Sequence, residues 1–240
     1  MTNVLILAAG SPPIDRDRVY DGYPLCLTDI DGKPLLERIF RSCDSLDCPS
    51  YLIAFQVFEI RRFFLDNIVQ LLTNNQCKTI AIEGETGGAA CTALLASEHI
   101  DSDEELLILN ANELLSVDFK SVSDNFRSQS LDAGVVIFPS IHPRYSYVRV
   151  DSHDMVVEAA EKRPISRDAT AGFYWYARGS DFVCSAKRMI RKNASVDNAF
   201  YICPVFNEMV LMNRRVGVCR ICKDQYLPLK TDRQFEKQER

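Results

Sequence analysis

The sequence predicts an α/β fold with a mixed, mainly parallel sheet, and two patterns along the chain support this. In the first half, short uncharged apolar runs alternate with segments whose apolar residues recur at helical spacing. Such alternation is typical of parallel strands joined by right-handed helical crossovers. In the second half, several strand-like runs follow one another without a helix between them, which predicts a small antiparallel insertion.

The first half of the chain contains four expected strands, each short, apolar and uncharged: residues 3–8, 51–57, 79–82 and 106–109. Three helices are expected between them: one that begins at Pro34, one over 60–72 and one over 89–96. Residues 10–31 form a long irregular segment rich in proline, aspartate and glycine. Loops of this length inside a compact domain tend to be functional.

The second half contains five expected strands and two expected helices. The strands are expected where residues alternate or stay apolar: 134–138, 146–150, 155–160, 173–176 and 216–222. The helices are expected over 181–191 and 200–213, and the charged tail 230–240 is expected to be solvated. Because no repeat or linker divides the chain, we expect one domain over residues 1–240.

The composition excludes several classes of protein. The chain carries a net charge of -5, whereas a nucleic-acid-binding protein would show a basic excess or stripe. No apolar run approaches the ~20 residues of a membrane span, and residues 5–7 are too short for the apolar part of a signal peptide. We therefore expect a cytoplasmic protein that binds neither nucleic acid nor a membrane.

The nine cysteines are scattered along the chain, and in a cytoplasmic protein they are expected to be reduced. Cys219 and Cys222 form a C-x-x-C pattern, but there is no second pair and no histidine at the spacing of a zinc ligand. The residues around them alternate like a strand. We interpret them as two strand cysteines and expect no metal or redox site there.

The first expected strand ends in three small residues, Ala8, Ala9 and Gly10. Small residues after a buried strand allow another group to approach the backbone closely. In open α/β sheets, ligands bind in the crevice at the carboxyl ends of the parallel strands. We therefore expect Leu7, Ala8, Ala9 and Gly10 to line a nucleotide site.

Six segments carry a resemblance to a known family: 7–10 (LAAG), 31–37 (DGKPLLE), 87–92 (GGAACT), 161–166 (EKRPIS), 169–174 (ATAGFY) and 200–208 (FYICPVFNE). In this order and spacing, the chain resembles the sugar-phosphate nucleotidyltransferases, whose Rossmann-like three-layer fold is related to that of the GT-A glycosyltransferases. It is most similar to a capsule-associated branch that includes choline-phosphate-type cytidylyltransferases. The resemblance implies a nucleotide-binding half over 1–112 and an acceptor-binding half over 113–240.

The resemblance implies transfer of a nucleoside monophosphate from an NTP to a phosphorylated sugar or small alcohol, with Mg²⁺, in surface-polysaccharide precursor synthesis. Such chemistry relies on positioning, a metal and cations near the oxygens that gain charge. Lys162 would contact the acceptor's phosphate. The other implied positions are Gly87, Gly88 and Asn110 for the nucleotide, and Glu161, Gly172 and Tyr174 for the acceptor. A second copy of the chain or an active paralogue is a further candidate partner.

Two charged positions of the family are replaced in this chain. Leu25 stands where the family has a catalytic lysine, and a leucine cannot stabilise an anion. Asn112 stands where the family has a metal-binding aspartate, and a neutral amide is a poor Mg²⁺ ligand. Glu113 and Asp118 are the nearby carboxylates that could compensate for the missing aspartate.

The loop after the first strand also departs from the family. It has no second glycine, and its prolines remove backbone donors that would hold phosphates. Arg16 and Arg18 are the candidates for a triphosphate contact, although Asp15 and Asp17 dilute their charge. A family motif near the end of the chain is altered as well, to LKTDRQ at residues 229–234.

Three hypotheses of function remain open at this point. The first is an active nucleotidyltransferase with an altered site. The second is a catalytically inactive relative that binds a nucleotide or sugar phosphate, or that regulates an active partner. The third is a glycosyltransferase of the GT-A type, which would require an Asp-x-Asp motif where this chain has Asn110-Ala111-Asn112.

Overall fold

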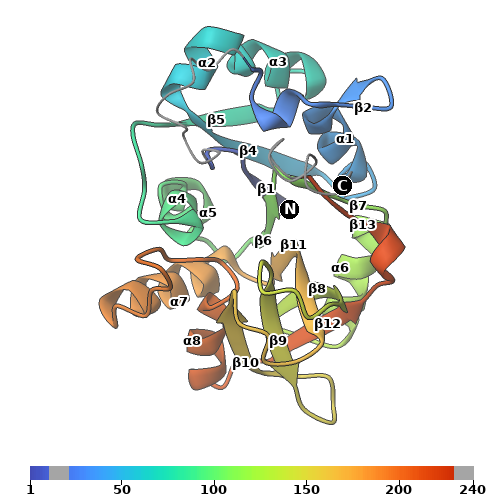
Figure 1. Ribbon diagram of the computed structural model, residues 1–240, viewed down its shortest axis with the longest axis vertical. Coiled ribbons are helices and arrows are strands. Elements are labelled where there is room, and N and C mark those ends of the chain that lie inside the picture. Colours follow the sequence, from blue (N-terminus) through green and yellow to red (C-terminus); the bar gives the residue numbers. More distant parts are fainter. Residues whose placement is uncertain (11–21, 230–240) are drawn as a thin grey trace, which may run out of the picture.

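The computed structural model describes residues 1–10 and 22–229, and a nine-stranded sheet forms the centre of this part of the chain (Figure 1). The strands run in the order β10-β9-β11-β6-β1-β4-β5, with β8 beside β11 and β12 beside β8. In chain order they are β1 (Thr2–Leu7), β4 (Pro49–Gln56), β5 (Cys77–Ile82), β6 (Glu105–Asn110), β8 (Ala133–Pro139), β9 (Ser146–Val150), β10 (Val156–Glu161), β11 (Asp168–Tyr176) and β12 (Val216–Arg220).

The two halves of the sheet differ in strand direction. In the first half, β1 lies between β4 and β6 and pairs with both in parallel, and β5 continues the parallel set beside β4. In the second half, β11 pairs antiparallel with β6, β8 and β9, and β9 pairs antiparallel with β10. The predicted α/β class, with its mixed sheet and antiparallel insertion, is therefore confirmed.

Helices cover both faces of the sheet and complete three layers. One face is covered by α4 (Ala89–Leu94), α5 (Ser97–Ile100), α7 (Gly179–Arg191) and α8 (Val205–Leu211), on the left in Figure 1. The other face is covered by α1 (Leu35–Ser42), α3 (Leu65–Leu72) and α6 (Phe119–Ser128). Alternation along β1 supplies both cores, because Leu5 packs on the first face while Val4 and Ile6 pack on the second. None of the helices in the described ranges is long and apolar enough to cross a membrane.

Smaller elements connect distant parts of the chain. A two-stranded sheet pairs β7 (Glu113–Leu115) with β13 (Tyr226–Pro228), so the described end of the chain returns to the end of β6. A second one pairs β2 (Asp29–Ile30) with β3 (Lys33–Pro34). Two short 3₁₀ turns lie at Leu25–Leu27 and Lys223–Gln225.

Three local expectations need correction. The helix expected over 60–72 is two helices, α2 (Val57–Phe63) and α3, because Phe64 adopts a left-handed φ of 53° that ends the first. The helix expected over 200–213 is only α8. Strand β12 ends at Arg220, so Cys219 lies in a strand and Cys222 does not. All nine cysteines are free.

Candidate functional site

The carboxyl ends of the parallel strands bring the first predicted ligand residues together. Leu7 pairs in register with Asn110 of β6 on one side and with Ala54 of β4 on the other. The backbone continues this pairing, since the Ala8 amide donates to the Ala54 carbonyl at 3.0 Å. The buried side chain of Gln56 donates to the Ala9 carbonyl at 2.9 Å and fixes the start of the loop. Gln56 was not predicted as a site residue, because a single polar residue at the end of an apolar strand carries no distinctive signal.

The predicted glycine turn is closed by another part of the chain. Gly88 has a φ of 110°, and a Cβ there would lie 2.6 Å from both the amide nitrogen and the carbonyl oxygen of Phe200. The Phe200 amide donates to the Gly87 carbonyl at 2.7 Å, and the Ala90 amide donates to the Phe200 carbonyl at 2.9 Å. Gly88 is therefore required by the close approach of the Phe200 backbone, whereas a Cβ at Gly87 would lie 3.2 Å from the Cys91 sulfur.

A carboxylate occupies the space that Gly172 leaves open. The Glu113 carboxylate accepts hydrogen bonds from Asn110 Nδ2 at 2.5 Å and from the Tyr226 hydroxyl. A Cβ on Gly172 would lie 1.7 Å from Glu113 Oε1, so the glycine is needed for this carboxylate to fit. Burial raises the pKa of Glu113, the charge of the nearby Glu161 raises it further, and the two hydrogen bonds lower it in part.

Two of the predicted acceptor residues are buried near the expected crevice. Glu161 at the end of β10 is buried and accepts a hydrogen bond from the Ser146 hydroxyl. Burial raises the pKa of Glu161, while that hydrogen bond and the charge of Lys162 lower it in part. Tyr174 is also buried, and its hydroxyl shares a hydrogen bond of 3.0 Å with the Thr170 hydroxyl. Tyr174 thus supports the crevice from inside the core.

Lys162 keeps an ammonium at the surface of the crevice. Its Nζ donates to the Tyr201 hydroxyl at 3.0 Å and lies 3.3 Å from Asp197 Oδ2. The same nitrogen lies 5.2 Å from the centre of the Tyr201 ring. The hydrogen bond that Lys162 donates to Tyr201 is the largest of the effects that raise the pKa of Lys162, so the group stays protonated near neutral pH. Tyr201 and Asp197 were not predicted as site residues, because both contacts depend on chain crossings that spacing does not show.

The carboxylates near the end of β6 are already engaged and are not free to hold a Mg²⁺ ion. The carboxylate of Asp118 caps α6, where it accepts hydrogen bonds from the amides of Lys120 and Ser121. Glu113 is engaged by Asn110 and Tyr226, and Asn112 offers only an exposed neutral amide. Over residues 1–10 and 22–229, no cluster of three or more acidic, histidine or cysteine side chains could hold a metal. Mg²⁺ sites at nucleotides normally use one or two free carboxylates.

Leu25 and Gly10 carry no charge. Leu25 lies in the 3₁₀ turn Leu25–Leu27, half-buried against the core that α1 covers, so it is held by packing. Gly10 is exposed at the edge of the first described range. Arg16 and Arg18 lie outside the described residues.

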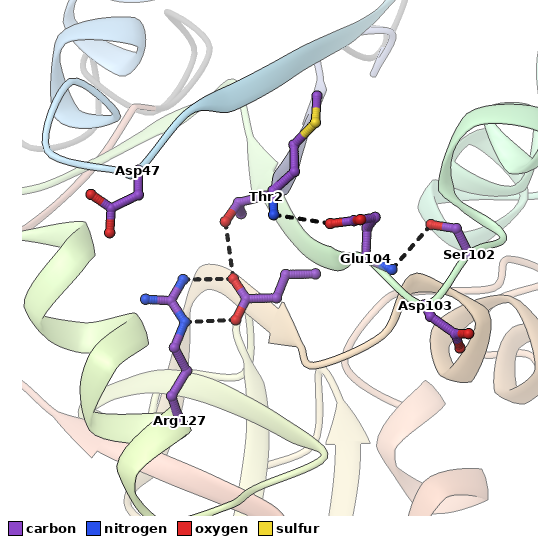
Figure 2. Close-up of a pocket in the computed structure, with 8 residues that line it drawn as sticks. Thr2, Asp47, Ser102, Asp103, Glu104 and Arg127 are labelled. Atoms are coloured by element: carbon purple, nitrogen blue, oxygen red, sulfur yellow. Dashed lines mark hydrogen bonds and ion pairs between the residues drawn. The ribbon is translucent and has the colours of Figure 1, made fainter.

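A cavity of about 560 Å³ lies at the opposite edge of the sheet (Figure 2). It forms at the amino ends of β1 and β6, where Arg127 makes a two-pronged ion pair with Glu105 at 2.6 Å. The Thr2 hydroxyl donates to the same carboxylate, and the N-terminal ammonium pairs with Glu104 at 2.9 Å. Because these charges neutralise one another, we interpret this network as structural.

Comparisons with known proteins agree with this architecture. The nucleoside-diphosphate-sugar pyrophosphorylase from Vibrio cholerae RC9 is similar with a TM-score of 0.79 and 18% identity, over 98% of each chain. HddC from Yersinia pseudotuberculosis, complexed with GMP-PN, has a TM-score of 0.66 and 16% identity, over 99% of this chain and 97% of that one. The inositol-1-phosphate CTP transferase from T. maritima has a TM-score of 0.65 and 14% identity, over 96% and 89%.

At such low identity these structures show a shared fold. No curated protein matches the sequence. The family model for nucleotidyl transferases matches residues 31–203, which is more than two thirds of the chain. That stretch includes the glycine turn, the ends of β6 and β10, and Lys162. The chain therefore belongs to the nucleotidyl transferase family.

Proposed function

We propose that this protein binds a nucleotide and a phosphorylated sugar in the crevice, and that it has lost the transfer of the nucleotidyl group. It is thus a nucleotidyltransferase-like protein that acts by binding. The family supports these ligands, as do the GMP-PN complex and the sugar-nucleotide pyrophosphorylase among the similar structures. The proposed loss of transfer rests mainly on Glu113. Its carboxylate fills the space beside Gly172 and accepts a hydrogen bond from Asn110.

The engagement of Glu113 matters because the negative charge on the phosphates has to be balanced during transfer. Nucleotidyl transfer is catalysed mainly by positioning and by cations near the oxygens that gain charge. The chain has Leu25 and Asn112 where the resemblance implies a lysine and an aspartate. Removing one such stabilising group typically costs about 10²–10³ in rate. Because this chain lacks both the lysine and the aspartate, little transfer is expected.

The acceptor half keeps what binding requires. The Lys162 side chain is 42% exposed, and the Tyr201 hydroxyl holds its ammonium in place. A compact ammonium of this kind is well suited to a phosphate. We expect Lys162→Gln to weaken the binding of a sugar 1-phosphate by about 10- to 100-fold, because a hydrogen bond to a charged group contributes roughly 1.5–3 kcal/mol.

Isothermal titration calorimetry with glucose 1-phosphate tests this prediction, together with titrations of the common NTPs. Lys187→Gln is the matched control, since Lys187 is also exposed and also faces a carboxylate, Asp101 at 3.8 Å, but lies on α7. The control should bind like the wild type. Equal binding by Lys162→Gln and the wild type would show that the sugar phosphate does not bind at Lys162.

The setting of this function is also a proposal. From the resemblance to the capsule-associated branch, we propose that the protein works in the cytoplasm in surface-polysaccharide precursor synthesis. An active paralogue is the proposed partner, because a binder of this kind gains a role when another enzyme carries out the transfer. Co-purification with a paralogue that releases pyrophosphate is the expected result.

The second candidate is an active nucleotidyltransferase with an altered site. The hydrogen bond from Lys162 Nζ to Tyr201 supports this candidate equally, because the acceptor's phosphate has to be held for transfer as well as for binding. In that case Mg²⁺ would be bound mainly by the phosphates of the NTP. Release of pyrophosphate distinguishes the two candidates.

A further inference from the structure

The segment from Val196 to Tyr201 connects the glycine turn at Gly87 and Gly88 with Lys162. At one end, Val196 and Ala199 exchange two backbone hydrogen bonds of 2.9 Å each. The residues between them, Asp197 and Asn198, have left-handed φ angles of 50° and 59°. Two consecutive residues of this kind form a tight turn that places Asp197 at its tip.

The other end of the segment is fixed. Phe200 makes two backbone hydrogen bonds to the glycine turn, one to Gly87 and one to Ala90, and its backbone fills the space beside Gly88. Tyr201 follows directly, so the fixed backbone determines where its hydroxyl lies. The segment therefore has a fixed base that carries Tyr201 and an exposed tip that carries Asp197.

Both ends of the segment contact the same ammonium. The Tyr201 hydroxyl lies 3.0 Å from Lys162 Nζ, and Asp197 Oδ2 lies 3.3 Å from it. The backbone of Lys162 is itself held, since its amide donates to the Tyr145 carbonyl at 3.1 Å and its φ is 52°. Lys162 thus has a defined position, with one neutral partner and one anionic partner.

The two partners differ in how easily they can be replaced. The Asp197 side chain is 71% exposed, and ion pairs between exposed groups are worth only about 0–1 kcal/mol. A phosphate also accepts charge-assisted hydrogen bonds from an ammonium, and it brings more negative charge and more acceptor oxygens than one carboxylate. A phosphate can therefore displace Asp197, whereas Tyr201 can stay in contact with Lys162.

We propose that Asp197 is an internal counter-ion of Lys162 that the phosphate of the bound ligand displaces, and that Tyr201 is the residue that positions the ammonium for it. The inference rests on the proposed function, because it takes Lys162 as the phosphate contact. It assigns opposite effects to two neighbours of one lysine. Removing Asp197 tightens phosphate binding, and removing the Tyr201 hydroxyl weakens it.

The test is calorimetric titration of the whole protein with inorganic phosphate and with glucose 1-phosphate at low ionic strength. We expect Asp197→Asn to tighten binding of both ligands by about 2- to 5-fold, which is the size of an exposed ion pair. The gain should shrink as salt is added, because exposed charges are screened. Tyr201→Phe should weaken binding by a similar factor. The asparagine keeps the shape of the turn and tolerates its left-handed φ.

Two controls separate a local effect from a general one. Asp101→Asn removes the same charge from another exposed pair, with Lys187, and should leave the affinity unchanged. In a Lys162→Gln background, Asp197→Asn should no longer matter, since the two residues act through one contact.

Unchanged or weaker binding by Asp197→Asn would overturn the counter-ion role. Tighter binding caused by Asp197→Asn in the Lys162→Gln background would also overturn the counter-ion role, because the effect would then come from net charge alone. Failure of the proposed function looks different, because Lys162→Gln would then bind glucose 1-phosphate as well as the wild type. In that case no phosphate contacts Lys162, and the counter-ion role falls with it.

Discussion

Replacing Gly172 with alanine is expected to destabilise the protein by about 3 kcal/mol and to disrupt the crevice. Gly172 has a φ of 66°, a conformation that costs an alanine roughly 1–2 kcal/mol. The new Cβ would lie 1.7 Å from Glu113 Oε1 and 3.0 Å from Asn110 Nδ2. Glu113 would have to move away from Asn110 and Tyr226, and leaving buried polar groups unpaired costs about 1–3 kcal/mol.

Urea denaturation of four variants, namely Gly172→Ala, Glu113→Ala, their double variant and Gly84→Ala, separates strain from collision. Gly84 has a similar φ of 73° but open space around it, so Gly84→Ala measures the backbone strain alone and should cost about 1 kcal/mol. The double variant Gly172→Ala/Glu113→Ala should be less destabilised than the sum of its parts, since the collision is gone. Equal effects at Gly172 and Gly84 would show that Glu113 does not fill this space.

The second large effect concerns Glu59, a buried carboxylate near the start of α2. Burial raises the pKa of Glu59 to about 7, and a hydrogen bond from the backbone of Gln56 lowers it in part. The ordinary pKa of this group is 4.5. A carboxyl whose pKa rises on folding favours the folded state when it is protonated. Its contribution is therefore fully present below about pH 4.5 and is lost as the pH rises through 7.

Glu59→Gln is thus expected to stabilise the protein above neutrality. At pH 8 the gain in the free energy of unfolding should be about 3 to 4 kcal/mol, since each pKa unit corresponds to about 1.4 kcal/mol. At pH 4.5 the variant and the wild type should be equally stable. Denaturation curves from pH 4.5 to 8.5 measure this, with the exposed Glu98→Gln as the control. A gain that does not change with pH would mean that Glu59 titrates normally.

The parts of the fold that depend on local pattern could be predicted from the sequence. The apolar runs at 3–8, 51–57 and 106–109 are strands, and parallel strands end at the same edge of a sheet, so Leu7 and Asn110 meet as expected. The break at Phe64 could not be predicted, because the apolar spacing on either side is continuous and aromatic residues rarely adopt a left-handed φ.

The contacts that define the crevice depend on chain crossings that a single sequence does not display. Tyr226 reaches Glu113 from 113 residues away, through the short pairing of β13 with β7. Gly172 meets Glu113 because the pairing of β11 with β8 shifts register between Thr170 and Tyr174. Sequence pattern identified the small residue at 172 and the carboxylate at 113, but it could not show that one accommodates the other.

The most direct test of the proposed loss of transfer is the release of pyrophosphate by the wild-type protein. Each common NTP would be incubated with Mg²⁺ and a panel of sugar 1-phosphates and phosphorylated small alcohols, at protein concentrations high enough to detect a single turnover. We predict no release above the protein-free control. Saturable, Mg²⁺-dependent release that Lys162→Gln abolishes would contradict the account and identify the protein as an active transferase.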